Sequence, residues 1–146
     1  MNVKPSIRII FLLILLAEVA LSSGLVLAQA PGKPINSQRT NGMTVVVSNE
    51  SGKFTGGENA VCAIFQDLET GGPVDVQNVS LKFTLRVGRI PGGTIAAQLN
   101  RDGQGRYCGH VNLGRQYYNP AKYYVDMHYT DITGKKRNLS FWVTVT

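Results

Sequence analysis

The strict alternation of apolar and polar residues in the segment 78–87, which reads NVSLKFTLRV, constrains the fold most. Successive side chains of a β-strand point to opposite faces of a sheet, so a period of two predicts a strand that is buried on one face. A helix with this pattern would scatter its apolar residues around its whole circumference. The residues expected to face a core are Val79, Leu81, Phe83, Leu85 and Val87.

The chain after residue 42 repeats this pattern in short runs that are separated by Gly, Pro, Asn and Asp. These residues favour turns, and no run has the 3.6-residue apolar period of an amphipathic helix. The other expected strands are 43–49, 59–67, 94–99, 105–113, 121–129 and 138–146. Seven short strands in about a hundred residues predict an all-β fold, a seven-stranded antiparallel β-sandwich of immunoglobulin-like type.

The first 28 residues have the pattern of a secretory signal peptide. Lys4 and Arg8 precede an apolar run over 9–16, and a second apolar patch ends at Ala28. A basic start, an apolar helix and small residues near a cleavage point are typical of export signals, so we expect a periplasmic or extracellular protein. The alternative is an uncleaved anchor, because 9–28 has about the ~20 residues that span a bilayer. Glu18 in the middle of this run disfavours that alternative.

The remaining chain is predicted to be one domain behind a linker. Residues 29–42 are polar and rich in Pro, Gly and Asn, which predicts a flexible linker, and 43–146 form the sandwich. The length allows a single core and no second domain. The net charge is +6 and the cations are scattered. A nucleic-acid-binding protein would carry a dense basic stripe, so that class is excluded, while weak attraction to anionic envelope polymers remains open.

The chain has two cysteines, Cys62 and Cys108. With the seven strands labelled A to G in chain order, they fall on strands B and E, which are neighbours in an immunoglobulin-like sheet. Alternation points both outward on the same face. In an exported protein this arrangement predicts a disulfide, with Cα atoms roughly 4.4 to 6.8 Å apart. The alternative is a copper or zinc site formed by these two thiols and His110.

A second set of outward side chains lies on the opposite predicted sheet. Aromatic and charged groups on a flat sheet suit a protein, peptide or glycan partner, so we expect a protein or an envelope polymer to bind there, with membrane contact only during export. The alternative interpretation is cross-strand pairing that stabilises the sheet. The residues of this expected binding face are Lys82, Arg86, Tyr124, Asp126, His128 and Trp142.

Catalytic motifs are not found in the sequence. The two histidines, His110 and His128, are expected on opposite sheets, so a catalytic triad has no centre. No glycine-rich loop opens a helix that could hold a phosphate. The sequence therefore predicts a non-catalytic protein without a resident cofactor.

Several short motifs suggest a family. They are Gly57-Glu58-Asn59, Asp67-Leu68-Glu69-Thr70-Gly71-Gly72-Pro73-Val74, Asn78-Val79, Asp102-Gly103-Gln104-Gly105-Arg106-Tyr107 and Tyr123-Tyr124-Val125-Asp126-Met127. With these motifs, nearly all of 43–146 resembles the YtkA-like and FixH-like domains, small extracytoplasmic immunoglobulin-like modules of bacteria. The shared elements are mostly structural, so the resemblance implies the same fold and a location outside the cytosol.

The same resemblance implies an alternative function in copper handling or oxidase assembly. Some relatives are associated with copper through Met-rich segments after the third strand. The corresponding segment here, 88–93, reads GRIPGG and contains neither Met nor His. The leading expectation is therefore a binding module, with copper handling as the alternative.

The exported protein should begin at Gln29. Val26 and Ala28 suit a signal peptidase, whereas cleavage after Ala30 would place Pro31 directly behind the broken bond. Intact-mass measurement of the secreted protein tests this expectation. A mass that includes residues 1–28 would show instead that the segment is kept as an anchor.

Overall fold

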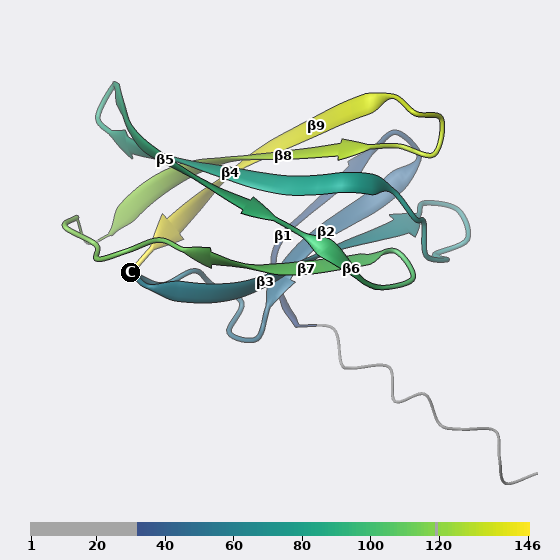
Figure 1. Cartoon of the computed structure of the whole chain (residues 1–146), viewed down its shortest axis with the longest axis horizontal. Helices are drawn as coiled ribbons and strands as arrows, with labels where there is room; N and C mark the ends of the chain where they lie inside the picture. Colours follow the sequence, from purple (N-terminus) through teal and green to yellow (C-terminus); the bar gives the residue numbers. More distant parts are fainter. Residues whose placement is uncertain (1–31, 119) are drawn as a thin grey trace, which may run out of the picture. The chain divides into compact units, whose positions relative to one another are not determined.

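The computed structural model describes residues 32–118 and 120–146, so the predicted signal segment 1–28 lies outside the described residues. Nine strands make up the described chain (Figure 1). Their bounds are β1 Lys33–Thr40, β2 Met43–Asn49, β3 Glu58–Asp67, β4 Gln77–Val87, β5 Ile90–Gln98, β6 Asn100–Gly103, β7 Arg106–Asn112, β8 Ala121–Thr130 and β9 Lys136–Val145. In these two ranges, no helix has the length and apolar character needed to cross a membrane.

The strands form two antiparallel sheets. One has the order β1-β2-β3-β7-β6 and the other the order β5-β4-β8-β9. The strands β2, β3, β7 and β6 follow the order A-B-E-D of an immunoglobulin-like sheet, and β4, β8 and β9 follow the order C-F-G of its partner. The predicted immunoglobulin-like β-sandwich is therefore confirmed, with two strands more than the sequence indicated.

The core lies between the sheets and is built from the alternating apolar positions. Phe65 and Tyr129 come from opposite sheets, and their ring centroids are 5.0 Å apart in an edge-on contact. Val79, Leu81 and Phe83 are fully buried as the alternation predicted, and Leu85 is partly buried. Val87, also expected to face the core, is 37% exposed because β4 leaves the sandwich there. The buried apolar residues of the described chain all lie within 43–145. The sandwich therefore has a core of its own, as an independently folding domain requires.

The predicted flexible linker 29–42 is wrong for most of its length, because Lys33–Thr40 forms strand β1. This strand pairs with β2 along its whole length, ending at Thr40 opposite Met43. Asn41 and Gly42 both have positive φ angles, 49° and 75°, as a two-residue hairpin turn requires. An edge strand with half-exposed side chains lacks a strong apolar pattern, so only the Asn-Gly pair indicated this hairpin.

The expected strand 94–99 lies in the other sheet. It belongs to β5, which pairs with β4, and the expected turn 100–103 is strand β6, which pairs with β7. The reason is the short connection after β4: only Gly88 and Arg89 separate it from β5, and so close a connection favours an antiparallel hairpin. The chain crosses between the sheets at Leu99, which is buried.

The turn between β8 and β9 is organised by Asp131. Its carboxylate accepts hydrogen bonds from the Thr133 hydroxyl at 2.6 Å, from Arg137 Nε at 2.7 Å and from the backbone amides of Thr133 and Lys135. The Thr133 hydroxyl and the Arg137 guanidinium contribute most to holding the pKa of Asp131 well below its usual range. The ionised carboxylate is thus part of the folded turn.

Acid should weaken the fold through this residue. A carboxyl group whose pKa is depressed in the folded state stabilises it above the unfolded pKa of about 3.9, and this stabilisation is lost as the pH falls below that value. We expect Asp131→Asn to lower Tm at pH 7 and to reduce the further fall of Tm in acid. Thermal unfolding from neutral to acidic pH measures both effects. The exposed Glu69, changed to Gln, is the control, and an equal acid response of all three proteins would contradict the prediction.

Candidate functional site

The outer face of the sheet β5-β4-β8-β9 carries all six residues that the sequence predicted for a binding face. Register explains their arrangement: Lys82 lies opposite Asp126, and Tyr124 lies between Thr84 and Trp142. Alternate residues of β8, namely Tyr123, Val125, Met127 and Tyr129, are buried, so the residues between them point away from the core. We call this surface, defined by Lys82, Arg86, Tyr124, Asp126, His128 and Trp142, the aromatic face.

Three of these residues form a continuous contact. The rings of Tyr124 and Trp142 are 5.1 Å apart between centroids and tilted by 58°. The Arg86 guanidinium carbon lies 5.9 Å from the centroid of the same Tyr124 ring, within the range of a cation–π contact. Trp142 is nevertheless 58% exposed. The aromatic face therefore exposes the indole of Trp142 to solvent. Tyr124 packs against this indole, and Arg86 contacts Tyr124 in turn.

The other half of the aromatic face is polar. Ser140 Oγ donates a hydrogen bond of 2.6 Å to Asp126 Oδ1 and so orients this carboxylate. Lys82 and His128 are exposed. Hollows border both halves: one is lined by Lys122, Trp142 and Thr144, and another includes His128 and Arg137. The surface thus combines an apolar end with a polar end that can form ion pairs and hydrogen bonds.

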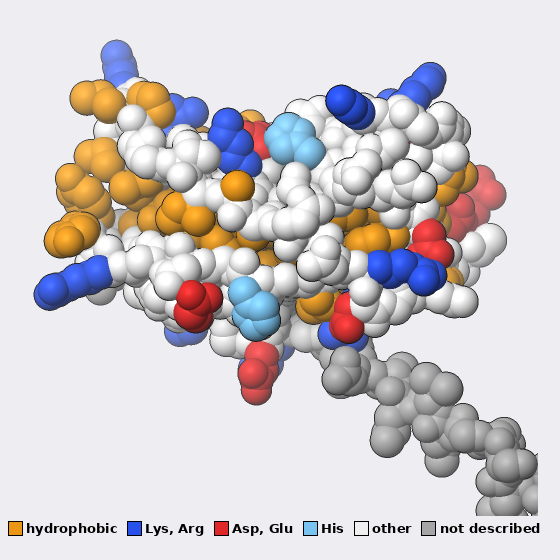
Figure 2. Space-filling model, in the orientation of Figure 1, with side chains coloured by type: hydrophobic (Ala, Val, Ile, Leu, Met, Phe, Trp, Pro, Cys, Tyr) orange, Lys and Arg blue, Asp and Glu red, His pale blue; other side chains and the backbone are white. Residues whose placement is uncertain are grey.

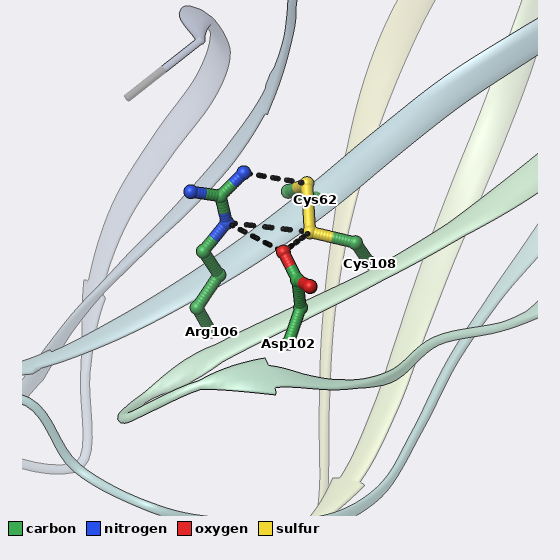
Figure 3. Close-up of a disulfide and its surroundings, with 4 residues drawn as sticks. All are labelled: Cys62, Asp102, Arg106 and Cys108. Carbon is green, nitrogen blue, oxygen red and sulfur yellow. Dashed lines mark hydrogen bonds and ion pairs between the residues drawn. A yellow bond between two sulfur atoms is a disulfide. The ribbon is translucent and has the colours of Figure 1, made fainter. Parts of the chain in front are cut away.

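The predicted disulfide is confirmed on the outer face of the other sheet. Cys62 and Cys108 are directly paired residues of β3 and β7, and their sulfur atoms are bonded (Figure 3). Their Cα atoms are 4.1 Å apart, slightly closer than the range expected from the sequence. The reason is that the two residues face each other across paired strands, where Cα atoms come closest.

An ion pair, which the sequence did not reveal, lies over this bond. Arg106 Nε donates to Cys108 Sγ at 3.4 Å, and its Nη2 lies 3.7 Å from Cys62 Sγ. Asp102 Oδ2 is 3.4 Å from Arg106 Nε and 3.5 Å from Cys108 Sγ. Figure 3 shows both side chains beside the disulfide. The expected turn at 100–103 hid this contact, because only strand β6 places Asp102 beside β7.

The alternative metal site would require Cys62, Cys108 and His110 together. His110 is an exposed residue of the same strand as Cys108, but both sulfur atoms are used by the disulfide. In the part of the chain that the structure describes, no group of three His, Cys, Asp or Glu residues is placed to hold a metal ion. A metal at this position would need the thiolates that oxidation has removed.

The two histidines lie on different sheets, as the alternation predicted. His110 belongs to β7 and His128 to β8, and both are exposed. Among the described residues, neither imidazole is hydrogen-bonded to a serine or a carboxylate, the arrangement typical of a general base.

Sequence reasoning also missed an exposed apolar cluster at one end of the sandwich. Ile90 is 72% exposed in the β4–β5 hairpin, and Tyr117 is 86% exposed in the loop before β8. The pair Tyr117-Tyr118 is visible in the sequence, between the expected strands 105–113 and 121–129. That these loops are neighbours follows only from strand pairing.

No protein-family model matches the chain, and no curated protein matches it. Among solved structures, murine CRIg is similar, with a TM-score of 0.38 and 11% sequence identity over 63% of this chain and 86% of that chain.

The disulfide should contribute strongly to stability. It closes a loop between residues separated by 46 positions. In the chain-entropy treatment such a loop stabilises the fold by up to about 4 kcal/mol. We expect the double variant Cys62→Ser, Cys108→Ser to lose much of this free energy of unfolding, measured by urea denaturation. Two reactive thiols in denatured, unreduced wild-type protein would contradict the disulfide itself.

Proposed function

We propose that the protein is an exported, non-catalytic binding module whose aromatic face captures a protein or an envelope polymer. The observation that carries this proposal is the exposure of Trp142 above Tyr124. Binding hot spots are enriched in Trp, Tyr and Arg, and here Tyr124 contacts both Trp142 and Arg86. They form a preassembled anchor on a rigid sheet.

The surroundings of this anchor match the anatomy of an interface. A typical interface has an apolar centre and a polar rim that fixes the orientation of the partner. Lys82, Asp126 and His128 supply such a rim on one side of Trp142. Because the side chains project from adjacent strands of one sheet, a partner would meet them without large rearrangement.

Export is supported by two independent features. The first 28 residues have the composition of a signal peptide, and a disulfide is typical of proteins that function outside the reducing cytosol. The motif resemblance to YtkA-like and FixH-like domains supports a location outside the cytosol. Copper handling, the alternative function, gains no support from the arrangement around Cys62 and Cys108, since the disulfide uses both thiols.

Truncation of Trp142 tests the proposal. If Trp142 anchors a partner, Trp142→Ala should weaken binding by about 2 kcal/mol or more, about thirtyfold in Kd, with an unchanged Tm. Trp142→Phe should retain part of the affinity because it keeps an aromatic ring. Partners are first captured from envelope extract with the wild-type protein, and each is then titrated against the variants.

Ile132→Ala provides the control, because Ile132 is also exposed, at 78%, but lies in the β8–β9 connection away from the aromatic face. Equal affinity of Trp142→Ala and wild type for every captured partner would contradict the proposal. A lower Tm together with unchanged binding would show that Trp142 serves only to stabilise the sheet.

A further inference from the structure

A second exposed apolar surface lies at one end of the sandwich, next to the end of the aromatic face that carries Arg86. Its residues are Val87 and Ile90 of the β4–β5 hairpin and Tyr117 and Tyr118 of the loop before β8, with exposures of 37%, 72%, 86% and 53%. We call this surface the loop-end patch. Figure 2 shows orange side chains gathered at the left end of the molecule, where Figure 1 places this hairpin and this loop.

Strand pairing brings the two segments together. β4 and β8 are antiparallel, and the last residues that they pair are Arg86 and Lys122. Beyond this pair β4 continues into the hairpin, while β8 is preceded by the loop that carries Tyr117 and Tyr118. The tips of both segments therefore project from the same end of the sandwich.

The charged residues on the segments that form the loop-end patch are all positive. The hairpin carries Arg89, and the loop and the start of β8 carry Arg115 and Lys122. The segments 76–101 and 103–125, which include these elements entirely, contain no Asp or Glu. Glu58 of β3 approaches the base of the loop, where Asn112 donates a hydrogen bond of 2.7 Å to it. Apolar tips flanked by cations complement a surface that is negatively charged and has an apolar interior.

We propose that the loop-end patch docks on the surface of an anionic lipid bilayer. Tyrosine side chains suit the headgroup region, because the ring is apolar and the hydroxyl can remain hydrated. Cations near an anionic bilayer add attraction. The centre of a protein–protein interface is instead depleted of charged residues, and loop tips offer a smaller area than a sheet face. Membrane contact then continues after export, beyond the expectation drawn from the sequence.

Vesicle sedimentation tests this proposal. The probe is vesicles of phosphatidylglycerol and phosphatidylcholine in equal parts, compared with vesicles of phosphatidylcholine alone. The protein spans residues 29–146, because the apolar segment 1–28 would itself bind lipid and the sandwich has its own core. We expect binding to the anionic vesicles that weakens as salt is added, since salt screens exposed charges.

Variants then locate the contact. Ile90→Ser combined with Tyr117→Ser should reduce the partition coefficient by about tenfold or more, because both apolar tips are lost. Arg89→Gln combined with Arg115→Gln should reduce the partition coefficient by about fivefold for each cation that contacts the bilayer. These two substitutions change no residue of the buried core. Ile132→Ser is the matched control, since it removes an equally exposed isoleucine from the β8–β9 connection. It should bind as wild type does.

Failure of the wild-type protein to bind the anionic vesicles, or equal binding by both double variants, would overturn the proposal. Equal binding to vesicles of phosphatidylcholine alone would overturn the anionic assignment. Sedimentation velocity without lipid provides a further test: a dimer that Ile90→Ser, Tyr117→Ser abolishes would assign the patch to a second copy of the chain instead. Ile90→Ser, Tyr117→Ser keeps Trp142, Tyr124 and Arg86, so a loss of vesicle binding in this variant is assigned to the loop-end patch and not to the aromatic face.

Discussion

The contact between aromatic rings of the two sheets is the interaction on which the remaining structure depends. Phe65 of β3 meets Tyr129 of β8 across the two sheets, with ring centroids 5.0 Å apart. Phe54, from the connection between β2 and β3, extends this packing against Phe83 of β4 at 5.1 Å. These contacts bury one face of each strand. A shift of register by one residue would move every side chain of a strand to the opposite face of the sheet. The aromatic face is thus a consequence of the core, because burying Tyr123 and Val125 of β8 turns Tyr124 outward.

The two sheets have different outer faces. The five-stranded sheet carries the disulfide between β3 and β7, with Arg106 and Asp102 over the sulfur atoms. The four-stranded sheet has no such cross-link among its described residues and instead displays Trp142 and Tyr124. Aromatic and aliphatic side chains fill the interior. The disulfide lies outside this core and joins the neighbouring strands β3 and β7 of one sheet. This arrangement leaves the opposite sheet available for a contact surface.

The aromatic face and the loop-end patch differ in the way they present apolar groups. On the aromatic face the indole lies on a flat, rigid surface with both charge signs around it, as Lys82 and Asp126 illustrate. At the loop-end patch the apolar groups occupy tips of connections, and the charged residues of these connections are all positive, with Glu58 only at the base of the loop. A flat surface of mixed charge complements a folded or polymeric partner, whereas protruding tips of one charge complement a soft anionic layer.

The sequence by itself determined the strands with a buried side, the inward residues along most of their length, and the pairing of Cys62 with Cys108. Val87 at the end of β4, expected inward, is exposed instead. A period of two in a single segment reports burial directly, so Met43–Asn49 could be predicted to the residue. Edge strand β1 lacks that signal and was missed. Only the tertiary structure decided that β5 joins β4, that Asp102 lies beside Arg106, and that Ile90 and Tyr117 share one end. Local patterns record which side of a strand is buried, but the choice of neighbouring strand depends on contacts between residues distant in the chain.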